Sequence, residues 1–218
     1  MGKEREYQVD TSFYLYKNVI KRILDISVSL VALIVLLIPF LIIALLIKFD
    51  SKGPVLFKQV RMGKNDVPFD ILKFRSMYET APHQMSTSQL DNPSHHVTTI
   101  GKFLRKTSLD ELPQLINVIK GDMSIVGPRP LILSEKNVLN LRTRNGASKV
   151  LPGITGLAQV NGRDELPDDE KAQFDNYYAA NVSLSLDFKI IMKTFIDVLD
   201  ERGIKEWVKN RSTVSRTF

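Results

Sequence analysis

An apolar stretch near the N-terminus dominates the hydropathy pattern of this 218-residue chain. It runs from Ile26 to Ile47, and a helix of about 22 residues can cross a hydrocarbon core of roughly 30 Å. Pro39 lies inside the stretch, where a proline removes a backbone hydrogen bond and bends a helix. Basic residues flank both ends, whereas a spanning helix usually shows a one-sided Lys/Arg bias. The pattern fits a re-entrant helix-break-helix hairpin broken at Pro39, with an ordinary transmembrane helix that tolerates the proline as the alternative.

The rest of the chain has the pattern of an α/β domain, mixed and mostly helical with short strands. Strands are expected over 55–61, 69–76 and 157–160. Helices are expected over 100–105, 112–119, 131–150, 168–178 and 186–199, and a polar loop over 78–93. Segment 204–218 is typical of a membrane-surface segment or of a basic disordered tail. We therefore expect an N-terminal tail (1–18), a membrane re-entrant segment (19–48) and a catalytic domain (49–218).

Composition narrows the chemistry without deciding it. The formal net charge of +6 and the pI near 9.4 favour anionic partners, which include phosphates, anionic lipids and nucleic acid. The chain has no Cys, which excludes thiol catalysis and Cys-ligated metal sites. It contains no Walker A, GxGxxG or HExxH motif, which weakens the case for a P-loop, a Rossmann site or a zinc protease.

The acidic pair Asp110-Glu111 is the first candidate for chemistry. Ser108 and Glu111 have the spacing of a capping box, so both carboxylates are explained simply by the first turn of a helix. The same geometry also supports a functional interpretation. A helix N-terminus lowers the pKa of a carboxyl group and attracts phosphate, so Asp110 is a candidate nucleophile toward phosphorus and Glu111 a candidate ligand of a divalent cation.

Basic residues in three other segments are candidate phosphate ligands. Lys73 and Arg75 are expected to share one face of a strand, opposite two apolar residues. Arg129 lies between two prolines, which stiffen the backbone that presents its guanidinium. Arg163 follows a Gly-containing turn. Each of these residues alone is more often an ordinary solvated side chain.

In this order, the segments resemble the bacterial sugar transferase family, the monotopic phosphoglycosyl transferases. The resemblance covers about residues 19–199. The matching runs are Lys21-Arg22-Ile23-Leu24-Asp25, Gly53 to Gln59, Lys73-Phe74-Arg75-Ser76-Met77, Ser108 to Leu115, Gly121 to Pro130 and Pro152 to Arg163. Two positions depart from the family pattern: Ile38 stands where many members have Ser before the membrane proline, and Leu151 stands where a basic residue is common.

The resemblance implies an enzyme that transfers a phospho-sugar from a UDP-sugar to polyprenol (undecaprenyl) phosphate and releases UMP. Asp110 would carry the phospho-sugar covalently and Glu111 would hold Mg²⁺. Arg129 and Arg163 would bind phosphates or the nucleotide, with Lys73, Arg75 and Arg105 as weaker candidates. It also implies a bacterial cytoplasmic membrane location with the catalytic domain on the cytoplasmic face, contact with membrane lipids and no nucleic-acid partner.

The acidic run after Arg163 is similar to capsule-initiating members of the family, which points to exopolysaccharide or capsule assembly and to an N-acetylated deoxy-sugar donor. A homo-oligomer remains open. Two other functions also remain open: an anionic-lipid-binding protein tethered to the membrane, and an inactive scaffold that retains the fold. Neither explains why an acidic pair lies between basic segments.

Overall fold

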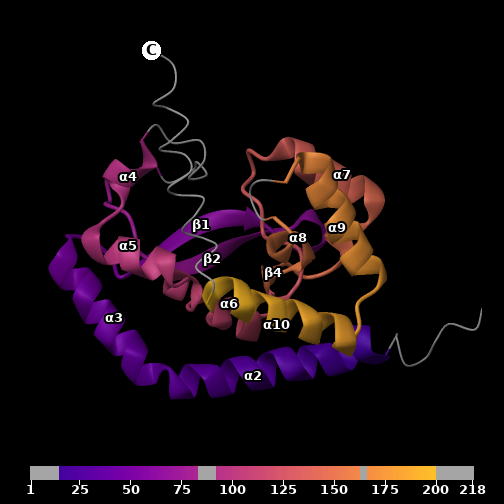
Figure 1. Cartoon of the computed structure of the whole chain (residues 1–218), viewed down its shortest axis with the longest axis horizontal. Helices are drawn as coiled ribbons and strands as arrows, with labels where there is room; N and C mark the ends of the chain where they lie inside the picture. The colour runs from indigo at the N-terminus through magenta and orange to yellow at the C-terminus, as the bar shows by residue number, and fades with distance from the viewer. Residues whose placement is uncertain (1–14, 83–91, 163–165, 200–218) are drawn as a thin grey trace, which may run out of the picture.

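Helices at the N-terminus form a bent pair along one edge of the molecule (Figure 1). The computed structural model describes residues 15–82, 92–162 and 166–199. A short π-helix, η1 (Tyr16–Ile20), leads into α2 (Lys21–Val35), and α3 (Leu37–Asp50) follows after a single residue. The two arms are bent by 64° relative to each other.

The break lies at Leu36 rather than at Pro39, where the sequence predicted it. Pro39 itself lies inside α3. A proline has no N–H to donate to the carbonyl four residues earlier, here that of Val35, and its ring crowds that carbonyl. The bend therefore falls in the turn before the proline. The backbone of Leu36 is no longer helical (φ −87°, ψ 4°), while the N–H of Phe40 donates to the Leu36 carbonyl at 2.8 Å.

Helix α2 buries polar residues, and both arms of the bent pair expose apolar ones. On α2 the deeply buried side chains are Asp25 and Ser29, which are 5% and 0% exposed. Large apolar side chains that are more than half exposed follow both arms: Val28, Leu30, Val31, Ile34, Val35, Leu37, Ile38, Leu41, Ile42 and Leu45. A continuous exposed apolar surface of this kind is typical of contact with lipid.

No single helix in the described part of the chain is long and apolar enough to cross a membrane, and α2 and α3 pass that test only as a bent pair. Polar contacts fix the pair to the domain as far as Asp25. The apolar part of α2 that follows, residues 26–35, extends about 15 Å at 1.5 Å per residue. The apolar part of α3, residues 37–47, extends about 16 Å. Each arm thus reaches only about half of a hydrocarbon core.

An antiparallel hairpin follows the helices. Strands β1 (Leu56–Met62) and β2 (Pro68–Phe74) are joined through the short turn η2 (Lys64–Asp66). Phe57 lies opposite Lys73, and Arg61 lies opposite Phe69. Because side chains alternate along a strand, this register puts Arg61 and Lys73 on the same face of the hairpin. The two strands predicted at 55–61 and 69–76 are confirmed.

Short helices follow the hairpin along the chain and pack against both arms of the bent pair. They are α4 (Pro93–His96), α5 (Thr99–Lys106), the single turn η4 (Leu109–Glu111) and α6 (Gln114–Lys120). Thr98 caps α5, since its hydroxyl accepts from the Gly101 N–H at 3.0 Å. A core cluster made of Ile43, Ile47, Phe74 and Leu104 joins α3, β2 and α5.

A second, parallel pair of strands crosses the centre of the domain. β3 (Ser124–Val126) pairs with β4 (Gly153–Thr155), and the four-residue helix α8 (Leu157–Val160) follows. The strand predicted at 157–160 is therefore wrong. Side chains close this segment into a turn, because the Gln159 amide donates to the Ile154 carbonyl at 2.9 Å and the Asn161 amide to the Leu157 carbonyl at 2.8 Å.

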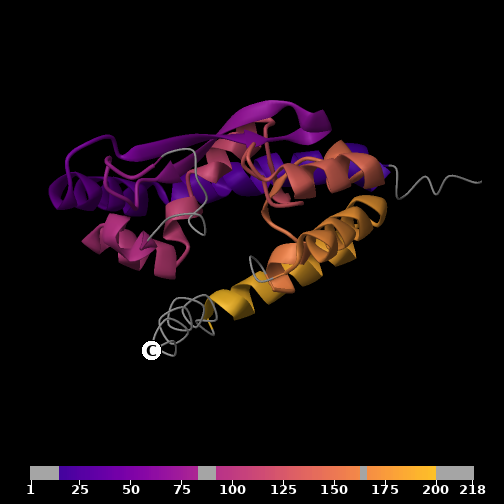
Figure 2. The same ribbon diagram turned by 90° about the horizontal axis from the view of Figure 1, so that it is seen from above.

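The remaining helices are α7 (Lys136–Asn145), the turn η5 (Ala147–Lys149), α9 (Asp168–Ala180) and α10 (Leu184–Leu199). The helix expected over 131–150 is shorter because Gly146, at φ 87°, ends α7. In Figure 2 the hairpin lies toward one side of the molecule, and α9 and α10 lie toward the other. The mixed α/β class is confirmed, whereas segment 204–218 lies outside the described residues.

The re-entrant hairpin stays a prediction, and single cysteines test it in a chain that has none. We expect that neither Arg5→Cys nor Asn210→Cys is labelled by an impermeant maleimide in intact cells, and that both are labelled after permeabilisation. External labelling of Arg5→Cys alone would show that the segment spans the membrane. Pro39→Ala restores a donor for the Val35 carbonyl, so it is the variant in which we expect the N-terminus to become accessible from outside.

Candidate active site

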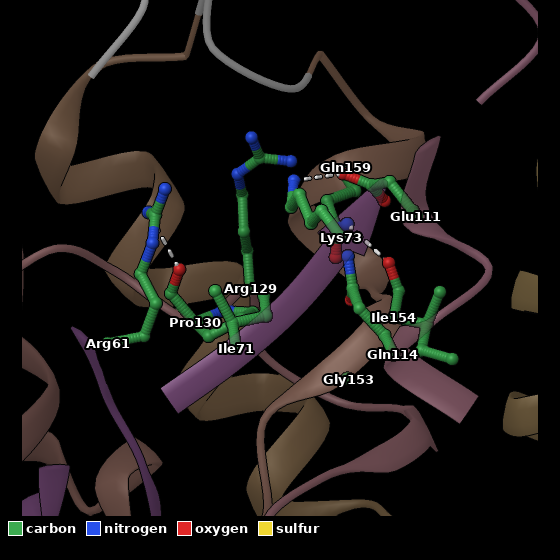
Figure 3. A pocket seen from close by; sticks show the side chains of 10 residues that line it. All are labelled: Arg61, Ile71, Lys73, Glu111, Gln114, Arg129, Pro130, Gly153, Ile154 and Gln159. Atoms are coloured by element: carbon green, nitrogen blue, oxygen red, sulfur yellow. Dashed lines mark hydrogen bonds and ion pairs between the residues drawn. The ribbon is translucent and has the colours of Figure 1, made fainter. Parts of the chain in front are cut away.

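A pocket opens where the hairpin meets η4, α6, β4, α8 and the loop after β3 (Figure 3). Its wall contains basic side chains from three segments, namely Arg61 of β1, Lys73 of β2 and Arg129 from the loop after β3, and the carboxylate of Glu111. The other lining residues are Ile71, Gln114, Pro130, Gly153, Ile154 and Gln159. Three cationic side chains in one wall create a potential that favours an anionic ligand.

Lys73 and Glu111 form an ion pair across the pocket. Lys73 Nζ lies 2.6 Å from Glu111 Oε1, and the two side chains are 18% and 24% exposed. The buried neighbours Leu72 and Phe74 hold the opposite face of β2 against the core, which directs Lys73 toward the pocket. The pair is therefore fixed in direction and still accessible to a ligand.

Asp110 lies beside this pair, on the single turn η4, and is only 9% exposed. Burial is the main reason that the pKa of Asp110 is raised to about 6. The charge of Lys73 acts to lower this pKa, that of Glu111 raises it, and that of Arg105 lowers it. At neutral pH Asp110 is thus mostly ionised although little water surrounds it, and a poorly hydrated carboxylate is well suited to attack an electrophile.

The predicted capping box at Ser108 is wrong. Ser108 adopts a left-handed conformation (φ 56°, ψ 15°), its side chain makes no capping hydrogen bond, and α6 begins only at Gln114. Only one turn follows Ser108, so no long helix lies behind Asp110 to stabilise its charge. The expected lowering of the Asp110 pKa is therefore also wrong, because desolvation outweighs the local electrostatics.

Three of the predicted site residues line one pocket, and the charges of Lys73, Glu111 and Arg105 act on the pKa of Asp110. Lys73, Glu111 and Arg129 line the pocket, and Figure 3 shows the side chains of Lys73 and Arg129 extending toward the same side of it. Arg105, on α5, is near enough for its charge to act on the pKa of Asp110. Arg163 lies outside the described residues.

Arg75 is placed elsewhere. It follows the end of β2, is 4% exposed, and donates through Nη2 to the carbonyls of Ser51 at 2.7 Å and Ile47 at 3.3 Å. It thereby holds the C-terminal end of α3 instead of lining the pocket. The expectation that Lys73 and Arg75 share a cationic surface is wrong, because the Arg75 side chain is buried against the end of α3.

Three pocket residues were missed by the sequence reasoning: Arg61, Gln114 and Gln159. Arg61 was considered only as a charge that flanks the apolar stretch. Its place in the pocket follows from the register of β1 against β2, which the spacing of the two strands could have suggested. Gln114 and Gln159 lie in helices whose neutral side chains gave no signal of chemistry.

The residues present fit a magnesium ion in a limited way. Mg²⁺ in phosphoryl-transfer sites is commonly held by one or two carboxylates together with substrate phosphates and water. Glu111 offers one accessible carboxylate at the pocket wall. The described residues contain no group of three or more potential metal ligands, so a site formed by protein side chains alone is not found among them.

This arrangement suits a transferase that acts on a phosphorylated substrate. A buried carboxylate of raised pKa lies next to cationic side chains that can neutralise phosphate oxygens. The exposed apolar surface of α2 and α3 is suited to contact with lipid. The two features together define a membrane-associated enzyme of phosphoryl or phospho-sugar transfer.

Comparison with known proteins gives the family. The family described as bacterial sugar transferase matches residues 16–201, and the chain belongs to it. The expectation of a sugar transferase enzyme of the phosphoglycosyl transferase class is therefore confirmed.

Relatives of similar length support this assignment. The chain is 38% identical over 190 residues to the uncharacterized sugar transferase EpsL of Bacillus subtilis, covering 86% of this chain and 91% of EpsL. It is 37% identical over 203 residues to the exopolysaccharide production protein ExoY of Sinorhizobium fredii, covering 84% and 87%. It is 44% identical over 183 residues to a Klebsiella pneumoniae protein named UDP-glucose:undecaprenyl-phosphate glucose-1-phosphate transferase, covering 81% of this chain but 39% of that longer protein.

The pKa of Asp110 predicts a pH profile. If ionised Asp110 is the reactive form, kcat/KM falls on the acid side with a midpoint near pH 6. The positive charge of Lys73 lowers this pKa, so Lys73→Met should move the midpoint to higher pH, besides reducing the rate. Lys58→Met, at an exposed position of the same hairpin, is the matched control and should leave the midpoint in place. If the acid-side midpoint of kcat/KM does not move in Lys73→Met, a group other than Asp110 is responsible for the loss of activity at low pH.

Proposed function

We propose that this protein transfers a phospho-sugar from a UDP-sugar to a polyprenol phosphate, releases UMP, and carries the phospho-sugar on Asp110 between the two steps. The observation that carries the proposal is the buried carboxylate of Asp110, with a pKa raised to about 6, beside the Lys73–Glu111 pair. Family membership limits the chemistry to sugar transfer, and the pocket supplies cations for phosphate groups.

In the first step, a carboxylate oxygen of Asp110 forms a bond to the phosphorus that bears the sugar. The bond from that phosphorus to the bridging oxygen of the diphosphate breaks, and UMP leaves with the electron pair. An anion attacking a diphosphate meets charge repulsion, which Lys73 and Arg105 reduce through the same positive charges that lower the pKa of Asp110. Arg129, in the wall of the same pocket, can bind a phosphate of the nucleotide.

In the second step, a phosphate oxygen of the polyprenol phosphate attacks the same phosphorus. The bond to Asp110 breaks, its carboxylate is restored, and the product is a polyprenol diphosphate sugar. The burial of Asp110 has a second use here, because an acyl phosphate hydrolyses if water reaches it. A nucleophile with 9% exposure is shielded until the lipid phosphate enters.

We propose Mg²⁺ as the cofactor and Glu111 as the residue that would hold it. When bound, the ion would neutralise charge on the diphosphate oxygens. Glu111 is paired with Lys73 at 2.6 Å in this structure. On binding of the ion, either Lys73 and the ion would share the Glu111 carboxylate, or Lys73 would turn toward a substrate phosphate. The accessible position of both side chains is compatible with such a change.

The names of relatives support the donor and acceptor classes. One relative is named for UDP-glucose and undecaprenyl phosphate, another as an undecaprenyl-phosphate glucose phosphotransferase, and a third as the galactosyl transferase CpsE. These names favour a hexose donor and undecaprenyl phosphate as the acceptor, and the name of ExoY favours a role in exopolysaccharide production. The N-acetylated deoxy-sugar suggested by the acidic run after residue 163 stays a prediction.

The bent helix pair supports a place at the cytoplasmic membrane. Its arms of about 15 and 16 Å enter a bilayer only part-way, so a hairpin that enters and leaves by the same face accounts for both the exposed apolar surface and the basic residues at each end. We propose that the catalytic domain lies on the cytoplasmic face, where nucleotide-sugars are made. The lipid phosphate of the acceptor would then lie at the same level as the base of the hairpin.

The proposal is tested by UMP release in nanodiscs that contain undecaprenyl phosphate and Mg²⁺. We expect release of UMP from at least one donor in a panel of UDP-glucose, UDP-galactose and the UDP derivatives of N-acetylated deoxy-sugars. Asp110→Asn should lose about a thousandfold or more, because an amide cannot form the acyl phosphate. Asp70→Asn, at an exposed position of β2, is the control and should remain active.

The same assay separates the alternatives. Glu111→Gln should need a higher Mg²⁺ concentration than the wild type, because an amide oxygen lacks the charge that Mg²⁺ prefers. A wild-type protein that releases no UMP from any donor would favour the scaffold or the lipid-binding protein. Near wild-type release by Asp110→Asn would contradict the covalent mechanism.

A further inference from the structure

The loop that presents Arg129 is held at four consecutive carbonyl groups. The Pro128 carbonyl accepts from the Gly153 N–H at 2.9 Å, and the Leu131 carbonyl accepts from the Met62 N–H at 2.8 Å. The Pro130 carbonyl accepts from Arg61 Nη1 at 3.2 Å. The carbonyl of Arg129 itself accepts from Arg142 Nη1 at 2.7 Å.

Arg142 differs from the other three donors. Gly153 and Met62 use backbone N–H groups, and Arg61 also lines the pocket. Arg142 belongs to α7, is 7% exposed, and is not part of the pocket wall. It reaches the loop from behind, so its effect on a bound substrate must pass through Arg129.

The guanidinium of Arg142 is itself fixed by a buried carboxylate. Arg142 Nε donates to Asp175 Oδ2 at 2.8 Å, and Nη2 pairs with the same oxygen. Asp175 lies on α9 and is 1% exposed; burial raises its pKa, and the charge of Arg142 opposes that change. A planar guanidinium can bind a carboxylate with one edge and a carbonyl with another, which a Lys ammonium on a flexible stem cannot do in a fixed direction.

This contact controls the remaining freedom of the Arg129 backbone. Pro130 restricts the residue before it to extended conformations, with ψ between about +120° and +160°, and ψ is the angle that directs the Arg129 carbonyl. The bond from Arg142 fixes that direction. A buried ion pair is often no more stabilising than apolar residues of the same volume, so stability alone gives little reason for a charged pair at this place.

We propose that Arg142, oriented by Asp175, is a positioning residue that holds Arg129 in its phosphate-binding direction. The inference rests on the proposed function for its activity readout. It assigns to α7 and α9 a part in substrate binding, although neither helix supplies a side chain to the wall of the pocket.

A double-mutant cycle tests the proposal in the full-length protein in nanodiscs. Arg142→Met should lower kcat/KM for the donor about tenfold, the size expected for a lost hydrogen bond to a charged group. In an Arg129→Ala background the same change should cost less than twofold, because the side chain that Arg142 positions is already gone. Asp175→Asn should follow the same pattern.

Asn145→Ala is the matched control, because Asn145 also ties α7 to α9, through its amide and the Ala172 carbonyl at 2.9 Å, without touching the Arg129 loop. It should lower the melting temperature and leave kcat/KM within twofold in both backgrounds. If Arg142→Met does not fold, Arg142→Lys keeps the charge for Asp175 and should show a smaller loss with the same dependence on Arg129.

Binding of UDP with Mg²⁺, measured by calorimetry, separates this inference from the proposed function. A wild-type protein that binds UDP but transfers no sugar would contradict the function, while the cycle in Kd would still show whether Arg142 acts through Arg129. Equal losses for Arg142→Met in both backgrounds, or no loss in the wild-type background, would overturn the positioning role. A wild-type protein that neither binds UDP nor transfers sugar would overturn both.

Discussion

The polar contacts at the base of α2 are the constraint on which the rest of the structure depends. Lys21 Nζ binds Asp187 Oδ2 at 2.7 Å, and the Tyr178 hydroxyl donates to the other oxygen of Asp187 at 2.8 Å. Asp25 accepts from the Ser124 hydroxyl at 2.6 Å and from the N–H of Ile125 at 3.2 Å. A helix with an apolar outer surface is thereby fastened to α9, α10 and β3 by charged and hydroxyl groups. The N-terminal part of α2 is thus held by the protein through polar contacts, and the two arms beyond Asp25 carry many exposed apolar side chains.

The same contacts fix the position of the active-site residues relative to the bent helix pair. β3, which Asp25 holds, leads directly into the loop that carries Arg129. Asn117 of α6 binds the Leu72 N–H at 2.9 Å and the Asp70 carbonyl at 2.8 Å, which links the helix after Asp110 to the strand that carries Lys73. The proposed nucleophile, the cationic side chains and the bent helix pair therefore belong to one framework.

Local patterns in the sequence were enough for part of this framework. Periodicity predicted the hairpin strands and most helices, and the resemblance to the sugar transferase family predicted that Lys73, Asp110, Glu111 and Arg129 serve one site. Properties set by tertiary packing were not predictable in this way. The pKa of Asp110 follows from desolvation by neighbours distant in the sequence, and a capping motif at Ser108 suggested the opposite sign. Arg75 has the chemistry of a phosphate ligand, but its side chain is buried and binds the backbone at the end of α3.

Mass spectrometry of the protein incubated with its UDP-sugar and Mg²⁺, without polyprenol phosphate, tests the central claim most directly. The account predicts that the peptide containing Asp110 gains the mass of one phospho-sugar, and that added undecaprenyl phosphate removes it. Asp110→Asn should show no such gain. Transfer that proceeds with no adduct in the wild type, or an adduct on a peptide without Asp110, would contradict the assignment of Asp110 as the nucleophile.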